Sequence, residues 1–367
     1  MTPDADSLVA LGARSEALAL LRGSAEDVLT REWDPSRTRD LLDGEGPSWA
    51  RPLWERLRGL GWADLLVPEA HGGGGGTVSE LCVLAETVGT STAPVPLVAV
   101  SVANGCLARP APSAVPCVPI TGAPWSLTRS AGEFRLSGHH PFVAYGDTAD
   151  SFVTAAAHPD VDILLVHVDA NAPGVTSEPL DPLDGMPCAA VTFDDVNVDD
   201  DRIVARGPSA AGRWHATELT STVAWTAELT GLAAAANDLA VDYAKHRIAF
   251  GRPIGSFQAI KHRIVDQRAA IEVARALWLR AAVALDGGAP DASALTALAA
   301  FWAIDQLRAV PEGAIQVFGG IGYTWEHVAH VFLRRAAVLS ALLGPPARHR
   351  EVVVPWLLSR MSEPRPT

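Results

Sequence analysis

The hydrophobic pattern of this chain changes character twice, and these changes constrain its fold more than any single motif. Up to residue 107, apolar residues recur every three to four positions, the spacing of one helix face. Short alternating segments such as DILLVHV then follow, separated by Pro, Gly and Asp, before helical periodicity returns. The pattern predicts a mainly helical α+β protein with an N-terminal helical domain (1–107), a middle antiparallel β domain (108–208) and a C-terminal helical bundle (209–367).

Composition and charge exclude several classes of protein. The 367 residues are 48% hydrophobic, which is enough to bury a large core. With 42 acidic and 29 basic residues the formal net charge is −13, which repels phosphates, so we expect no nucleic-acid partner. No apolar run approaches the roughly 20 residues that span a bilayer. The N-terminus also lacks the basic flank and apolar core of a signal peptide, so we expect a cytoplasmic protein that does not bind membranes.

An arginine followed by a glycine corner in the C-terminal region suits a bound diphosphate, and a second glycine-containing motif follows further along the chain. The segment YAKHRIAFGRPIGSFQAIKH places Arg247 near a helix end, followed by a corner at Phe250 and Gly251. Arginine offers a planar fork of donors to phosphate oxygens, and glycine lets the backbone approach a ligand closely. A second segment, QVFGGIGY, begins at Gln316 and contains paired glycines. Either motif alone also fits a helix cap or a turn.

Together, and at this spacing, the motifs resemble the flavin-binding half of the acyl-CoA dehydrogenases. The order of helical, β and helical regions is similar to that fold over essentially the whole chain. The segments WADLLVPEAHGGGGGT and GYTWEHVAHVFLRRAAVLSALLGPPARHR also resemble parts of the family. The resemblance implies a C-terminal four-helix bundle and an FAD cofactor contacted by Arg247, Phe250, Gln258, Gln316, Gly319 and Gly320, with Phe142 and Ala144 beside the flavin ring. It further implies a homo- or heterotetramer, in which the arginine and phenylalanine contact a neighbouring subunit's FAD.

The glutamate that serves as catalytic base in such enzymes is missing from its two usual positions. Leu343 stands where most relatives carry it before a Gly-Thr pair, and Ser221 aligns with the second location. Removing an α-proton requires a carboxylate whose pKa is raised by burial. Glu228 is the only charged residue in LTSTVAWTAELTGLAAAAN and lies two helical turns after Ser221, which makes it the candidate base. Glu218 is a second candidate, and a buried glutamate equally fits an ion pair or a subunit contact.

The resemblance therefore implies FAD-dependent α,β-dehydrogenation of an acyl thioester, carried by CoA or by acyl carrier protein. Electrons would pass to an acceptor similar to electron-transfer flavoprotein. The chain looks most like short bacterial members, among them heterotetramer subunits that act on steroid side chains. Two alternatives stay open: a partner subunit that completes a neighbour's flavin site without its own base, and a flavin monooxygenase on the same fold. No metal site is expected, because His327 and His330 have no evident third ligand.

Overall fold

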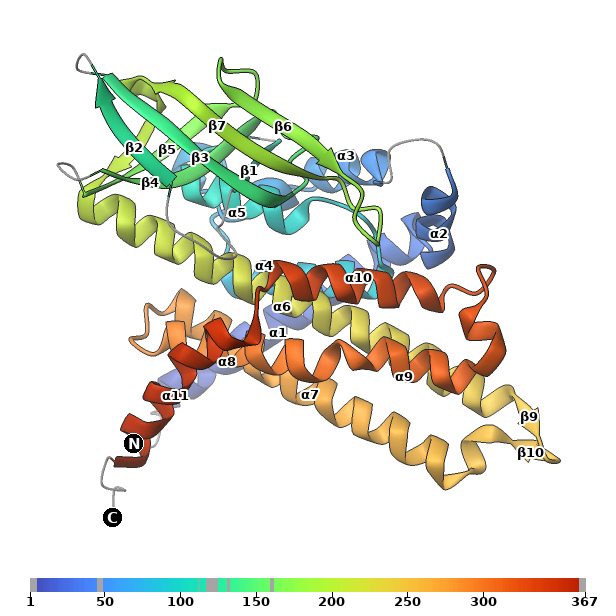
Figure 1. Cartoon of the computed structure of the whole chain (residues 1–367). Helices are drawn as coiled ribbons and strands as arrows, with labels where there is room; N and C mark the ends of the chain where they lie inside the picture. Colours follow the sequence, from blue (N-terminus) through green and yellow to red (C-terminus); the bar gives the residue numbers. More distant parts are fainter. Residues whose placement is uncertain are drawn as a thin grey trace.

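The computed structural model describes residues 5–44, 49–111, 113–116, 125–130, 133–158 and 162–362. It is mainly helical with one large sheet, which confirms the predicted α+β class (Figure 1). The N-terminal helices are α1 (Ala5–Glu32), α2 (Pro35–Asp43), α3 (Arg51–Gly59), α4 (Val78–Ser91) and α5 (Leu97–Leu107). Helix α4 begins with a capping box in which Thr77 and Glu80 exchange side-chain and backbone hydrogen bonds.

The sheet follows α5 in the chain. Its strands are β1 (Ala114–Pro116), β2 (Trp125–Ser130), β3 (Glu133–Ala144), β4 (Ser151–His158), β5 (Asp162–Asp169), β6 (Val175–Leu180), β7 (Cys188–Val198) and β8 (Ile203–Arg206). The strand order is β6-β7-β3-β2-β4-β5-β8, with β1 beside β4. The described sheet is mainly antiparallel, as predicted, but not entirely: β1 and β2 run parallel to β4, because the chain returns to that strand through longer connections, and the other described pairs are antiparallel. The sheet packs on α5 and on α6, the first helix of the next region.

The C-terminal region is built around a single long helix. Its elements are α6 (Gly207–His246), α7 (Gln258–Asp286), α8 (Ala292–Trp302), the π-helical turn η5 (Ala303–Leu307), α9 (Ala309–Phe318), α10 (Ala329–Leu342) and α11 (Pro346–Ser362). Helix α6 contacts α4, α5, α7, α8, α9 and α10 as well as β5 and β8, so it joins all three regions. Although α6 has 40 residues, no described helix is apolar enough over a sufficient length to cross a bilayer.

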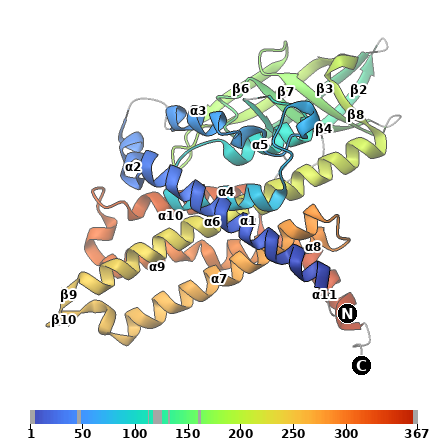
Figure 2. The ribbon, with the colours of Figure 1, turned by 180° about the vertical axis from the view of Figure 1, so that it is seen from behind.

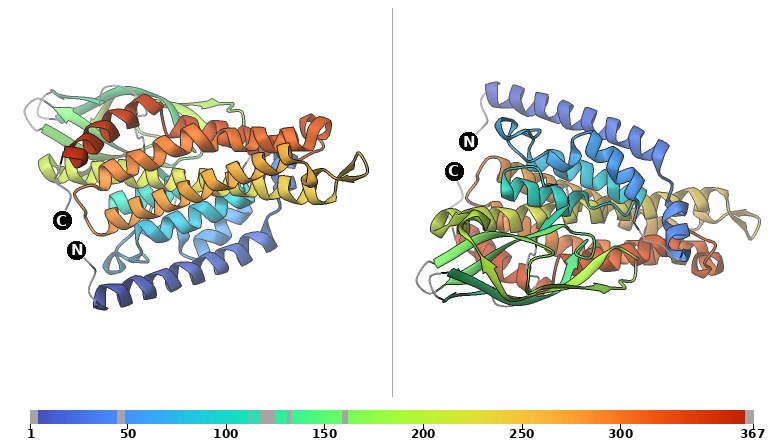
Figure 3. Two further views of the ribbon diagram at one scale, coloured as in Figure 1. Left: turned by 90° about the horizontal axis from the view of Figure 1, so that it is seen from below. Right: turned by 90° about the horizontal axis from the view of Figure 1, so that it is seen from above.

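Helix α1 lies outside the rest of the helical layer, on the side away from the sheet (Figures 2 and 3). It packs on α4, which in turn crosses α6. At that crossing the two backbones touch, because a Cβ added at Gly231 would collide with the Glu86 carbonyl oxygen and one at Gly89 with the Glu228 carbonyl oxygen. Two small residues therefore let α4 and α6 approach closely and bring two buried glutamates to the same crossing.

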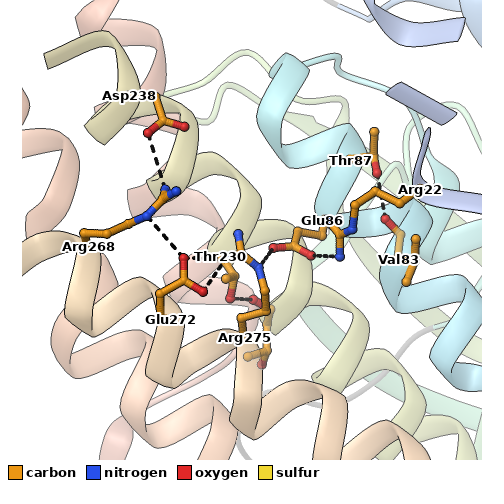
Figure 4. A network of polar contacts seen from close by, with 10 residues as sticks. Arg22, Val83, Glu86, Thr87, Thr230, Asp238, Arg268, Glu272 and Arg275 are labelled. Atoms are coloured by element: carbon orange, nitrogen blue, oxygen red, sulfur yellow. Dashed lines mark hydrogen bonds and ion pairs between the residues drawn. The ribbon is translucent and has the colours of Figure 1, made fainter. Parts of the chain in front are cut away.

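Glu86 holds α1, α4 and α7 together through a buried carboxylate (Figure 4). Its side chain is 0% exposed and lies 2.5 Å from Arg22 of α1 and 2.7 Å from Arg275 of α7. Arg275 also lies 2.7 Å from Glu272, one turn earlier on α7. Because a buried carboxylate is stable only when paired, these contacts fix the position of the outer helix α1.

We expect Glu86→Gln to lower the free energy of unfolding by about 3 kcal/mol, because two arginines lose the carboxylate that they share. Chemical denaturation monitored by circular dichroism would measure the change. Glu26→Gln, an exposed position on α1, is the matched control and should stay within about 0.5 kcal/mol of wild type. Equal stability of the two variants would show that the Glu86 contacts do not hold α1 in place.

Candidate functional site

A short hairpin at the far end of the bundle carries Arg247 and Phe250. Helix α6 ends at its base, and β9 (Ile248–Ala249) and β10 (Arg252–Pro253) project beyond the neighbouring elements (Figure 1). Phe250 and Gly251 form the turn with φ values of 52° and 77°, as tight hairpins require. The Phe250 side chain is 95% exposed, and the exposed Arg247 guanidinium has no hydrogen bond or ion pair within the described chain. Both side chains are therefore accessible to a ligand or to a second subunit.

The second glycine motif lies at the same end of the molecule. Tyr243 lies one turn before Arg247, and the centre of its ring is 5.1 Å from that of Phe318, the last residue of α9. Gly319 and Gly320 come directly after Phe318, so this contact places them near the start of the hairpin. A Cβ added at either glycine would meet no atom within 4 Å, so their backbone is open to a ligand. Two amide side chains, Gln316 and Gln258, are exposed on the elements that flank this end. A guanidinium, two amides and bare backbone fit the diphosphate and adenosine end of FAD.

Phe142 and Ala144 lie elsewhere, at the end of β3. Both are partly buried and pack against the main core, and the β3–β7 register is irregular between His140 and Val143, an interval that contains Phe142. Tyr145 follows with a φ of 59° and a fully buried side chain, whose pKa burial raises. The residues expected beside the flavin ring therefore belong to the junction between the sheet and the helices.

Glu228 is held in a buried ion-pair cluster at this junction. Its carboxylate lies 2.5 Å from Nη2 of Arg335 on α10, and Nη1 of Arg335 lies 2.9 Å from the carboxylate of Asp184, between β6 and β7. All three side chains are at most 5% exposed. Burial raises the pKa of Glu228, whereas the Arg335 guanidinium opposes that rise. The cluster provides the ion pair that a structural role for Glu228 requires, and its catalytic role stays a prediction.

The two positions that usually hold the base are buried and carry no acid. Leu343 is 3% exposed and Ser221 is 6% exposed. His349 of α11 donates a 2.7 Å hydrogen bond from Nε2 to the Leu343 carbonyl oxygen. His349 also lines a cavity of about 130 Å³ together with Glu218, which lies 3.7 Å from Arg348. Burial raises the pKa of Glu218, so a second acid with an altered pKa lies one helical turn from Ser221.

A single chain does not bring all the predicted residues together. Arg247 follows Glu228 on one helix at a distance of about 28 Å along the axis, at about 1.5 Å per residue. The residues suited to a diphosphate thus lie at the hairpin end, whereas Phe142, Ala144 and the candidate base lie at the junction with the sheet. This separation agrees with the expectation that Arg247 serves a neighbouring subunit.

Sequence reasoning missed the two partners of Glu228. Arg335 carried a usable signal, since it is one of two adjacent arginines in the mainly apolar helix segment AHVFLRRAAVLSAL. Asp184 lies in a Pro- and Asp-containing turn, where an aspartate is ordinary. Only the contact across 151 residues of chain reveals its role.

Comparison with known proteins identifies the fold and its chemistry. The acyl-CoA dehydrogenase N-terminal domain model matches residues 15–112, and the C-terminal domain model matches residues 221–358. The acyl-CoA dehydrogenase IpdE2 of Mycolicibacterium smegmatis is 30% identical over 335 residues, covering 90% of this chain and 96% of that protein. The chain belongs to the acyl-CoA dehydrogenase family. It is therefore a flavin oxidoreductase that uses FAD.

Two solved structures share the fold over almost the entire chain. The ChsE4–ChsE5 complex from Mycobacterium tuberculosis matches with a TM-score of 0.84 and 26% identity, covering 95% of this chain and 98% of that one. A variant of the Tcur3481–Tcur3483 steroid ACAD matches with a TM-score of 0.83 and 27% identity, covering 95% and 99%. These matches show that the chain shares its fold with both structures along nearly their whole length.

Proposed function

We propose that this acyl-CoA dehydrogenase chain is one subunit of a heteromeric enzyme, in which the base that removes the α-proton comes from the other subunit. One observation carries the proposal: both usual base positions are buried without an acid, and the nearby Glu228 is already paired with Arg335. The hydrogen bond from the buried Arg335 guanidinium opposes the effect of burial on the pKa of Glu228 and favours a structural ion pair over a base. The chain would then contribute cofactor-binding residues and the structural frame.

The cofactor is proposed to lie between two chains. Arg247, Gly319 and Gly320 would hold the diphosphate and adenosine end of a neighbour's FAD, since Arg247 is exposed and a Cβ added at either glycine would meet no atom within 4 Å. Phe142 and Ala144 would contact the flavin ring of a different FAD, the one that lies beside this chain's own sheet. When bound, FAD would supply the acceptor for the hydride from the β carbon, and Phe142 and Ala144 would orient its ring and exclude water.

The acyl group is proposed to be bulky, of the steroid type, because one structural relative is a steroid ACAD. The anionic arm of its CoA carrier would reach the cavity lined by Arg348, His215, Ser293 and Thr296, which is connected to Leu343 through His349. A guanidinium and hydroxyl groups there are suitable donors to phosphate oxygens. Acyl carrier protein as carrier, an acceptor similar to electron-transfer flavoprotein, and a cytoplasmic location stay predictions from the sequence.

A second candidate is a self-sufficient dehydrogenase with Glu228 as base. The raised pKa of Glu228 supports it, and so does the composition of the cluster. Two buried carboxylates share one guanidinium, so the cluster carries a net negative charge when both are ionised. Such a cluster has a physical reason to take up a proton.

The visible spectrum separates these candidates. Purified alone, a subunit of a heteromer should contain little flavin, whereas coexpression with an acyl-CoA dehydrogenase subunit that carries the glutamate base should give a coloured complex that acyl-CoA bleaches without oxygen. A coloured homo-oligomer that bleaches by itself would contradict the proposal. Rapid reaction of the reduced flavin with oxygen, giving an oxygenated product, would support the monooxygenase alternative.

In the coexpressed complex, Glu228→Gln should leave the rate of flavin bleaching within about threefold of wild type, because this carboxylate pairs with Arg335 and does not take the proton. Stopped-flow absorbance under anaerobic conditions measures that rate. Glu351→Gln, at an exposed position on α11, controls for loss of a negative charge. Loss of bleaching by more than about 100-fold, with flavin content and folding retained, would assign the base to Glu228.

A further inference from the structure

A second cavity lies on the opposite face of α6 from the Glu218 cavity, where α5, the start of α4 and the end of α7 meet. Its volume is about 350 Å³. Apolar side chains form much of its wall, namely Leu66, Val78, Val102 and Leu285. On α6 the wall consists of Ala216, Thr217 and Thr220. This volume and mixed lining are typical of sites for small organic molecules.

The cavity contains a cation without a counter-ion. Arg213 is partly buried and donates one long hydrogen bond, 3.4 Å, to the Cys106 carbonyl oxygen. No carboxylate in the described part of the chain forms an ion pair with it. The acid in the same cavity, Asp286, accepts hydrogen bonds of 2.7 Å from the Val78 amide and 2.6 Å from the Ser79 hydroxyl at the start of α4. Asp286 is thus committed to capping α4, and the Arg213 charge remains available.

We propose that this cavity binds a small amphipathic carboxylate. The carboxylate would pair with Arg213, and the Thr220 hydroxyl lines the same cavity as a further donor. The apolar body would lie against Leu66, Val102 and Leu285, and this contact would remove apolar surface from water. The site is separate from the proposed substrate cavity, because Arg213 and Thr220 are on one face of α6 whereas Glu218 and Thr222 are on the other. A free acid could therefore bind without displacing the acyl thioester.

Titration of decanoate into the flavin-containing protein by isothermal calorimetry tests this site. We expect saturable binding to wild type, at least tenfold weaker binding to Arg213→Gln, and no binding to Ala216→Phe. The last change places a ring at the cavity mouth from an exposed helix position, so folding should be unaffected. Arg280→Gln, an exposed arginine on α7, is the matched control and should bind as wild type does.

Further measurements test whether the carboxylate is required for binding and whether the site is distinct from the substrate cavity. Decanol should bind at least tenfold more weakly than decanoate, and inorganic phosphate should not compete if the apolar body contributes. Bleaching of the flavin by acyl-CoA should be the same in Ala216→Phe and wild type, which shows that the substrate cavity is intact. The proposal is overturned if decanoate does not saturate, or if Arg213→Gln and Ala216→Phe bind it as wild type does.

Discussion

Replacing Arg335 with methionine is expected to lower the free energy of unfolding by about 3–5 kcal/mol. The guanidinium is the shared partner of Glu228 and Asp184, and all three side chains are buried at the junction of sheet and bundle. Its removal leaves two carboxylates facing each other in a low dielectric, so one must take up a proton or the junction must open. Denaturant unfolding monitored by tryptophan fluorescence would measure the loss.

The adjacent Arg334 is the matched control. Its guanidinium lies 5.0 Å from the Trp325 ring and donates to the Leu183 carbonyl oxygen, both at the surface. Arg334→Met should therefore cost less than about 1 kcal/mol. Adding Glu228→Gln to the Arg335→Met variant should restore part of the stability, because one of the unpaired charges is removed. If Arg335→Met were as stable as Arg334→Met, the cluster would not join the sheet to the bundle.

Arg247→Gln is expected to weaken FAD binding by about 10- to 100-fold without changing the stability of the chain. Charge-assisted hydrogen bonds are worth about 1.5–3 kcal/mol, and the exposed Arg247 has no partner within the described chain that would keep it from a diphosphate. The affinity can be measured by titrating the apoprotein, in its oligomeric form, with FAD and following the quenching of flavin fluorescence.

Arg252 provides a control on the same hairpin. Its guanidinium stacks 4.3 Å from the Phe257 ring centre, so its charge is already engaged within the chain. Arg252→Gln should bind FAD within about threefold of wild type. If both variants bound FAD as tightly as wild type, Arg247 would not be part of the cofactor site. The proposal that the flavin is shared between chains would then be contradicted.

Local patterns in the sequence were sufficient for much of this molecule. Periods of about 3.6 and 2 residues separated helices from strands because each period follows from backbone geometry alone. The Phe250-Gly251 corner was readable for a similar reason, since a tight turn depends on neighbouring residues. The absence of a glutamate before Gly344 was also visible, because it concerns one position within a contiguous motif.

The environment of Glu228 was decided only by the tertiary structure. The sequence indicated that this glutamate is buried. It did not decide whether the glutamate serves as a base, forms an ion pair or contacts another subunit. Its partner Arg335 is 107 residues away, and Asp184 is 151 residues from that arginine. No local pattern encodes such contacts, because they depend on how α4, α6, α10 and the sheet pack together.

The sequence by itself determined the kinds of elements, the glycine corners and the set of residues suited to a flavin. The tertiary structure decided where these residues lie: the Arg247 group at the hairpin end, Glu228 about 28 Å away along α6, and Phe142 and Ala144 at the end of β3. The physical reason is that backbone preference acts over a few residues, whereas ion pairs, close helix crossings and cavities form only when distant segments exclude water from one another.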